Sequence, residues 1–222
     1  MNVPILYEDN HLLFVEKPVN VPVQEDQSKD QDLLNFLKED IKIRYQKPGN
    51  VYLALVHRLD RPAGGVMVFS KTSKAASRLS DAIRRQDVEK KYLAVVRGVP
   101  DKKQALLEDH LVKDKHENKV YTTHANHKDA KKAKLEYEVI GSKKNLSLLS
   151  IKLHTGRPHQ IRVQLSSRNL PLYGDQKYGE KWNQTGEQIA LWSETLAVEH
   201  PTKKEEIKVQ SQPPNKFPWN LW

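Results

Sequence analysis

A short polar turn in the first third of the chain carries the side chains best suited to chemistry. His57, Arg58 and Asp60 lie in this turn. Apolar, β-rich runs precede it (Val51–Val56) and follow it (Val66–Phe69). Runs that are apolar on both faces are typical of buried strands, so a rigid core should hold the turn. A carboxylate that leaves a buried strand loses water and needs a cationic or hydrogen-bonding partner. The pattern indicates either a functional carboxylate or an exposed turn whose aspartate caps backbone amides.

Two further segments present side chains of functional type. Lys90–Arg97 alternates as a strand should, which places Tyr92 on one face with other apolar side chains. Arg162 stands between Ile161 and Leu165, which form the buried stripe of a predicted helix, so part of its stem should be covered. On residues alone, Tyr92 also fits a core tyrosine, and Arg162 an arginine that reaches from an amphipathic helix to solvent.

Metal and cofactor sites are not indicated. The four histidines between residues 108 and 134 have irregular spacing and no supporting carboxylate pattern. That region predicts a solvated, basic hairpin or loop, which would attract phosphates. The chain has no cysteine, which excludes disulfides, thiolate metal sites and cysteine nucleophiles. It also lacks a G-x-G-x-x-G or P-loop pattern, so no cofactor and no metal are expected.

Bulk composition favours a polyanionic partner. The 222 residues carry a formal net charge of +9, with a pI near 9.5 and a mean hydropathy of -0.74. A basic balance of this kind suits nucleic acid. The length predicts a single domain over residues 1–222, since no repeat or linker divides it. No apolar run is long enough to cross a bilayer and no secretory signal is evident, so a soluble, cytoplasmic protein is expected.

The remaining elements follow from periodicity and local signals. Three helices are predicted. The first spans Asp30–Ile43 and is capped by Asp30 or Asp32, and the second follows a cap at Thr72 or Ser73. The third has Pro158 in its first turn. Strands are predicted at Ile5–Tyr7, Leu12–Val15, Lys90–Arg97, Leu135–Ile140, Leu146–Leu153, Ile189–Val198 and Ile207–Val209. The hairpin between Leu135 and Leu153 should turn at Gly141-Ser142. Asn20 and Asn169 suit positive φ, and the C-terminal aromatic residues should fold back on the core.

Three motifs occur in order along the chain: HRLDRPAGG, KKYLAVVRG and HTGRPHQIRVQLSSRNLPLYGDQKYG. Together they resemble the RluA-type family of RNA pseudouridine synthases, and Lys17-Pro18 resembles that family's first short motif. The likeness covers nearly the whole chain. It departs from the family at Ala63-Gly64, where Thr-Ser is usual, and at Asn20, where Gly is common. The motifs also begin too early for the S4-type RNA-binding domain found in many members, so none is expected.

The resemblance implies a fold and a catalytic set. The fold is α+β, with a mixed, mostly antiparallel central β-sheet flanked by helices and a catalytic cleft across the sheet. Asp60 matches the catalytic aspartate, Tyr92 the tyrosine that packs against the target uracil, and Arg162 the cation paired with that aspartate. Arg58 matches the arginine that fills the gap left by a flipped-out nucleotide.

Other residues of the same motifs are expected at the RNA. They are His57, Arg157, His159 and Gln160, with the two histidines serving as hydrogen-bonding groups rather than acid–base catalysts. The implied reaction, uridine to pseudouridine, moves ribose C1′ from uracil N1 to C5 and needs no cofactor. A target in a tRNA or rRNA stem-loop and a monomeric enzyme are expected.

Two other function classes stay open on the residues. A non-catalytic RNA-binding or ribosome-assembly protein could use the same scaffold, although it would have no use for a carboxylate facing phosphates. A carboxylate glycosidase would need a second acid across a cleft, and no such paired carboxylate stands out. The Asp60, Tyr92 and Arg162 set therefore favours a site-specific RNA isomerase that acts on a flipped-out uridine.

Overall fold

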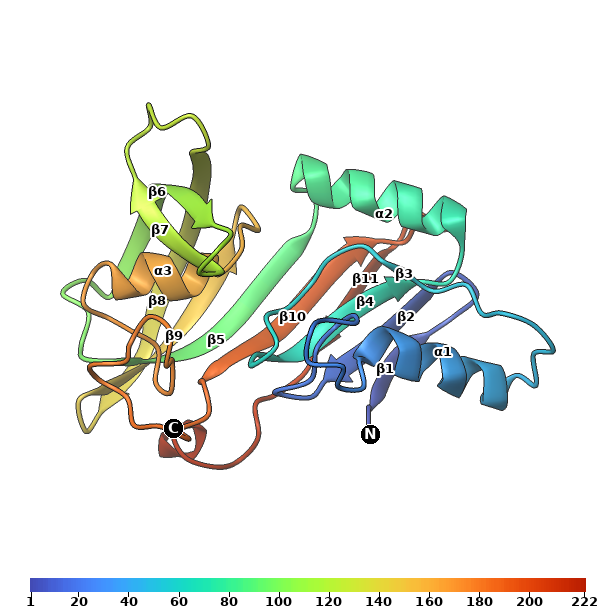
Figure 1. The fold of residues 1–222 in the computed structure, drawn as a ribbon, viewed down its shortest axis with the longest axis horizontal. Coiled ribbons are helices and arrows are strands. Elements are labelled where there is room, and N and C mark those ends of the chain that lie inside the picture. Colours follow the sequence, from blue (N-terminus) through green and yellow to red (C-terminus); the bar gives the residue numbers. More distant parts are fainter. The chain divides into compact units, whose positions relative to one another are not determined.

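The structure is a computed structural model that describes residues 1–222, and the chain divides into two compact units (Figure 1). The first unit comprises Met1–Glu89 and Ser193–Gln212. The second unit comprises Lys90–Trp192 and Pro213–Trp222. That residues 1–222 form a single domain stays a prediction.

The first unit is built on antiparallel strands. Its elements are β1 (Ile5–Glu8), β2 (Leu12–Lys17), α1 (Leu33–Arg44), β3 (Ala54–Leu55), β4 (Gly64–Ser70), α2 (Ser73–Arg85), β10 (Leu191–Glu199, from Ser193 onward) and β11 (Glu206–Gln210). The strand order is β1-β2-β4-β10, with β11 beside β10 and β3 beside β4. Helix α2 covers one face, where its Leu79 packs against Phe14 of β2 and Val68 of β4 in a buried cluster.

The helix starts follow the local signals. Asp32 caps α1, where its carboxylate accepts a hydrogen bond from the Asn35 amide at 2.9 Å. Thr72 caps α2, where its hydroxyl accepts from the Ala75 amide at 3.2 Å. Both caps satisfy backbone amides that have no partner inside the helix. These two predictions are confirmed, and α1 begins at Leu33 rather than at Asp30.

Only part of the apolar run before the polar turn, Val51–Val56, forms a strand. β4 is buried along its whole length, as predicted, but β3 comprises two residues of Val51–Val56 and Tyr52 is half exposed. Competition for the edge of β4 explains the difference. β10 occupies that edge near Gly65, where a Cβ would lie 2.2 Å from the Ser193 carbonyl oxygen. β3 therefore pairs only with Phe69 and Ser70.

The second unit is a five-stranded antiparallel sheet in the order β5-β9-β8-β6-β7. Its elements are β5 (Glu89–Arg97, from Lys90 onward), β6 (Gln104–Asp114), β7 (Lys119–Thr123), β8 (Lys131–Lys143), β9 (Leu146–Leu153), α3 (Gln160–Ser166) and the 3₁₀ turn η1 (Trp219–Leu221). α3 packs against β6 and β7 through Val163, which contacts Leu111 and Val120. The segment before residue 134, predicted as a basic hairpin or loop, forms a hairpin of β6 and β7 followed by the start of β8.

The turn between β8 and β9 lies later than predicted. It is formed by Lys144 and Asn145, with φ of 52° and 58°, and β8 runs through Gly141. The glycine serves a long-range packing contact rather than a turn. A Cβ on Gly141 would lie 2.6 Å from Nε1 of Trp222, so the missing side chain makes room for the C-terminal indole. The C-terminal segment folds back as expected, since Trp219 and Trp222 pack on the buried residues of this unit.

Candidate active site

The side chains of the turn at residues 57–60 differ in their exposure to solvent. Asp60 is partly buried, while Arg58 is exposed and makes no hydrogen bond or ion pair. Between them Leu59 is 8% exposed and anchors the turn in the core. The Ala63 amide donates to the Asp60 carbonyl at 3.0 Å and closes the chain back into β4. A purely structural Arg58 would pair with a nearby acid and stabilise the turn, and these contacts include no such pair.

His57 acts as a brace for the turn. Its Nε2 accepts a hydrogen bond from the backbone amide of Val68 at 3.0 Å. This bond takes the place of a ladder bond that β3 is too short to supply. Because Nε2 accepts, the proton of the neutral imidazole lies on Nδ1. The contact supports the hydrogen-bonding role expected for His57, and its contact with RNA stays a prediction.

A buried lysine lies beneath the same turn. Lys17 is fully buried, and its ammonium donates to the carbonyl oxygens of Pro18, Arg61 and Ala63 at 2.9, 3.0 and 2.7 Å. Burial lowers the pKa of Lys17 to about 7, and the negative charge of Asp60 opposes this effect. Lys17 thus ties the end of β2 to the residues that directly follow Asp60. The sequence marked this lysine only through the Lys17-Pro18 motif, without a role.

Arg61 binds the turn to the loop that precedes α1. Its guanidinium donates to the Asn20 carbonyl at 3.2 Å and to the Ser28 hydroxyl at 3.0 Å, and it pairs with Asp30. Asn20 has a φ of 63°, as predicted from its residue type. The loop before α1 is therefore fixed to the Asp60 turn by charge-assisted bonds.

In the second unit, Arg162 is held by an aspartate that sequence reasoning missed. Arg162 is 6% exposed, and its Nε and Nη2 each donate to a carboxylate oxygen of Asp175 at 2.8 Å. The Asp175 side chain is fully buried and also accepts the amides of Lys177 and Tyr178. This fork geometry fixes the guanidinium in one orientation and uses two of its five donor hydrogens. The only sequence signal was the Gly174-Asp175 pair near the end of the third motif.

The loop that carries Asp175 is itself fixed by Asn183. The Asn183 amide group donates to the carbonyl oxygens of Leu172, Asp175 and Gly179 at 2.9, 3.2 and 3.1 Å. Its oxygen accepts from the Gly174 amide at 2.9 Å. Since Asn183 is 8% exposed, these bonds lie largely out of water and hold the backbone firmly. No local pattern in the sequence distinguishes this asparagine.

His159 and Tyr178 pack together beside Arg162. The Tyr178 hydroxyl lies 2.7 Å from His159 Nδ1 and accepts from the Val120 amide at 2.8 Å. The Arg162 guanidinium carbon lies 5.1 Å from the centroid of the Tyr178 ring. His159 has a φ of 51°, so α3 begins only after it and Pro158 lies outside the helix, contrary to expectation.

Gln160 shapes the turn that leads into α3. It is 3% exposed, and its oxygen accepts from the Thr155 hydroxyl at 2.8 Å and the Arg157 amide at 3.0 Å. Its amide group donates to Lys134 and Gln164. These bonds give Gln160 a positioning role, and its expected RNA contact stays a prediction. Arg157 is partly buried and donates its Nε to the Lys132 carbonyl at 2.9 Å.

Tyr92 lies on the buried face of the second unit's sheet. It is 8% exposed and stands opposite Ile151 of β9. Ala94 and Val96 are also buried, in agreement with the predicted shared face. Thus one unit brings together His57, Arg58 and Asp60, and the other holds Tyr92, Arg157, His159, Gln160 and Arg162. The pairing of Asp60 with Arg162 stays a prediction.

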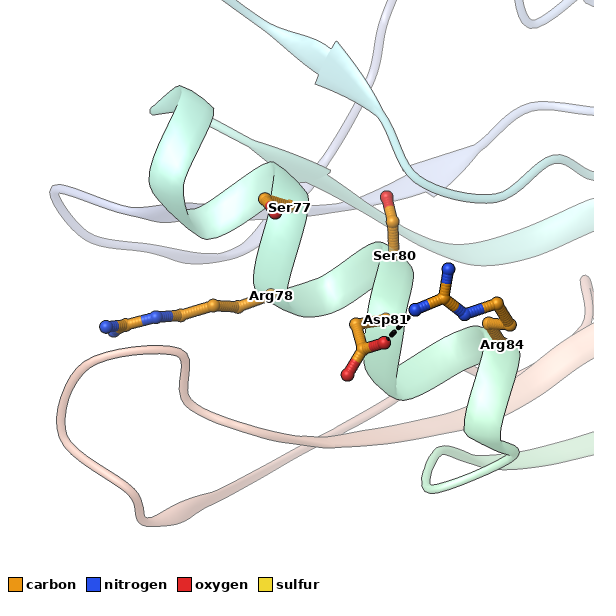
Figure 2. Close-up of a pocket in the computed structure, with 5 residues that line it drawn as sticks. All are labelled: Ser77, Arg78, Ser80, Asp81 and Arg84. Carbon is orange, nitrogen blue, oxygen red and sulfur yellow. Dashed lines mark hydrogen bonds and ion pairs between the residues drawn. The ribbon is translucent and has the colours of Figure 1, made fainter.

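The depression in Figure 2 contains none of these residues. It has a volume of about 470 Å³ and lies along α2 of the first unit, where Ser77, Arg78, Ser80, Asp81 and Arg84 line it. Asp81 pairs with Arg84, and Arg78 donates to the Pro201 carbonyl. No group of three or more histidine, aspartate or glutamate side chains is placed to hold a metal ion. None of the helices is long and apolar enough to span a membrane.

The sequence of this chain is similar to those of known proteins. The profile of the RNA pseudouridylate synthase family matches residues 11–167. The chain belongs to this family. An uncharacterized RNA pseudouridine synthase of Aquifex aeolicus is 32% identical over 97% of this chain and 72% of its own length. The ribosomal large subunit pseudouridine synthase C of Buchnera aphidicola subsp. Baizongia pistaciae is 33% identical over 94% of this chain and 66% of its own length.

The fold is shared with solved structures. Human RNA pseudouridylate synthase domain containing 4 superposes with a TM-score of 0.80 at 24% identity, over 95% of this chain and 88% of the human chain. This likeness confirms the α+β, mostly antiparallel fold. Membership of the family identifies the protein as an RNA pseudouridine synthase, an isomerase that acts on RNA. The alternatives of a non-catalytic RNA-binding protein and a glycosidase are therefore set aside.

Proposed function

We propose that this pseudouridine synthase isomerises a specific uridine of ribosomal RNA, with Asp60 as the catalytic carboxylate. Tyr92 packs against the uracil, Arg162 supplies the cation for Asp60, and Arg58 fills the gap left by the flipped nucleotide. These roles rest on the family resemblance of the three motifs. tRNA is the second candidate substrate, and ribosomal RNA comes first because several relatives carry the name ribosomal large subunit pseudouridine synthase.

The observation that carries the proposal is the preorganised turn around Asp60. Lys17 binds the carbonyl oxygens of Arg61 and Ala63, His57 accepts from the Val68 amide, and Arg61 donates to the Asn20 carbonyl. A carboxylate that acts at ribose C1′ or C2′ must be held within a narrow range of positions, because small misplacements cost orders of magnitude in rate. Asp60 is partly buried in this frame, which an aspartate that merely caps a surface turn would not require.

The chemistry needs an ionised carboxylate and a positioned base. Asp60 either attacks C1′ or removes the proton from C2′, and the bond from C1′ to uracil N1 breaks. The free uracil then rotates and bonds to C1′ through C5, and Asp60 is released as its bond to C1′ breaks or as the proton returns to C2′. C5 loses its proton and N1 gains one, so the product is an isomer of uridine and no donor or oxidant is needed. Arg162 would pair with the Asp60 carboxylate, and Asp175 fixes its guanidinium for that task.

The test has a cellular and a purified arm. Pseudouridines are mapped in total RNA from cells with and without the gene, and the site that disappears defines the substrate. With that RNA, purified Asp60→Asn should form no pseudouridine, while its melting temperature and RNA affinity stay near wild type. Asp129→Asn is the matched control, because Asp129 is exposed and its carboxylate makes no hydrogen bond or ion pair. Pseudouridine formed by Asp60→Asn above a trace of the wild-type rate would remove Asp60 from the mechanism.

We further propose that residues 1–222 act as one catalytic domain and as a monomer. The three motifs are distributed over both compact units, so neither unit carries the complete set. Sedimentation of the active enzyme should give a mass near 25.7 kDa. A dimer at the protein concentrations used for activity would contradict the monomer.

A further inference from the structure

Lys90 is a lysine of the second unit whose charge has no partner in the protein. It lies in β5, is partly buried, and makes no hydrogen bond or ion pair. Burial lowers the pKa of its ammonium, and no carboxylate counteracts that effect. An ammonium that loses water without gaining a partner costs free energy, so such a group is rarely kept for stability alone.

The register of the sheet places Lys90 beside the uracil-packing tyrosine. Tyr92 stands opposite Ile151, whereas Lys91 stands opposite Lys152. Since side chains alternate along a strand, Lys90 shares the face of Tyr92, while Lys91 and Lys152 lie on the other face. Two residues along a strand span about 6.7 Å, which is on the scale of one nucleotide.

The surroundings of Lys90 are basic and contain no free acid. A methyl group at Gly156 would lie 3.8 Å from Lys90 Nζ, so the ammonium sits against the turn that also carries Arg157. The carboxylates nearest in the sheet register lie on the other face. Glu136 stands opposite Lys152, and Glu108 stands opposite Lys134, one residue before Leu135 of the Tyr92 face.

We propose that Lys90 binds a phosphate of the RNA strand at the target uridine, next to the base held by Tyr92. The inference rests on the proposed function. The compact ammonium of lysine binds phosphate as a point charge, and an RNA phosphate would give Lys90 the ion-pair partner that it lacks in the protein. Lys90 is then a substrate-binding residue that fixes the flipped nucleotide by its backbone while Tyr92 holds its base.

The first test separates binding from folding. Lys90→Met should weaken binding of the mapped substrate stem-loop about tenfold or more, as for a lost charge-assisted bond. The log–log salt slope should become shallower by about 0.7, one phosphate contact. The melting temperature should stay or rise, because the variant removes a desolvated charge. Lys152→Met removes the same charge from an exposed, unpaired position on the opposite face and should leave binding unchanged. Lys90→Arg should recover most of the affinity.

The second test locates the contact on the RNA. A methylphosphonate linkage immediately 5′ of the target uridine removes one phosphate charge. On that RNA wild type and Lys90→Met should bind equally, whereas a methylphosphonate placed in the distal stem should preserve their difference. Equal losses on all three RNAs would overturn the proposal. Normal affinity with a reduced kcat would also overturn it, in favour of a contact to the departing uracil. The affinity measurement does not require turnover. If wild type were inactive, the proposed function would be refuted, but the comparison of RNA binding by wild type and Lys90→Met could still be interpreted.

Discussion

At the scale of single residues, chemistry and support are divided between different side chains. The residues named for chemistry from the sequence, Asp60 and Arg162, each depend on a group that the sequence did not mark for that role. Lys17 binds the carbonyls around the aspartate turn, and Asp175 orients the guanidinium. Both residues lie inside the matched motifs, but the likeness assigned them no role. Lys17 binds backbone carbonyls, which motif comparison does not register, and Asp175 binds a side chain 13 residues away.

Arg58 separates base flipping from a structural role. It is exposed and unpaired, so Arg58→Ala should leave the melting temperature unchanged. The rate on a structured stem-loop should fall about tenfold or more relative to the rate on a short unstructured RNA with the same uridine. The unstructured RNA demands little of the few kcal/mol that unstacking costs. The ratio of the two rates is the measurement, and equal losses on both RNAs would sink the flipping role.

Lys17 gives a prediction about positioning. Lys17→Met leaves three carbonyl oxygens, one of them fully buried, without their donor and relieves one buried charge, so the free energy of unfolding should fall by about 2 kcal/mol. The kcat should fall more than KM rises, because the loosened turn misplaces Asp60 after RNA has bound. Lys74→Met is the control, since Lys74 is exposed and unpaired. A variant that lost stability but kept the wild-type kcat would confine Lys17 to folding.

At the scale of elements, local signals were predictable and competition between distant segments was not. The caps Asp32 and Thr72 are fixed by residues three positions ahead, within reach of sequence reasoning. The length of β3 depends on which strand occupies the edge of β4. The course of β8 through Gly141 depends on Trp222 at the end of the chain. Neither neighbour can be identified from a window of sequence around the affected residues.

The turn between β1 and β2 holds a pH-dependent clamp. Burial alone would raise the pKa of Asp9, but hydrogen bonds from the amides of His11 and Leu12 and from His200 and Tyr7 lower it to about 2. A lowered carboxyl pKa contributes stability that is present above its unfolded value and lost as pH falls towards 2. Asp9→Asn should lower the free energy of unfolding by about 2 kcal/mol at pH 7.

The measurement for Asp9 is denaturant unfolding at several pH values. The difference between wild type and Asp9→Asn should shrink as pH falls from about 4 to about 2. Asp129→Asn should show no such trend, because the Asp129 carboxylate is exposed and unpaired. A difference that stayed constant down to pH 2 would show that the clamp does not act through the Asp9 charge.

At the scale of the whole molecule, charge favours the RNA partner more than any one contact does. The composition gives the net charge of +9, and the structure shows where some of the positively charged side chains are exposed. Lys113, Lys115 and Lys128 lie exposed on and around the β6–β7 hairpin of the second unit. Counterion release from RNA phosphates makes such binding strongly dependent on salt.

The salt dependence of RNA affinity tests this distribution. Wild type should lose affinity steeply as salt rises, with a log–log slope of about −0.7 for each phosphate contacted on single strands. The triple variant Lys113→Gln, Lys115→Gln, Lys128→Gln should have a slope shallower by up to about 2, because up to three phosphate contacts disappear. The control carries Lys42→Gln, Lys47→Gln and Lys74→Gln in the first unit, with the same change in net charge. If both triples flattened the slope equally, net charge rather than the hairpin would govern binding, and a flat response in wild type would contradict electrostatic binding altogether.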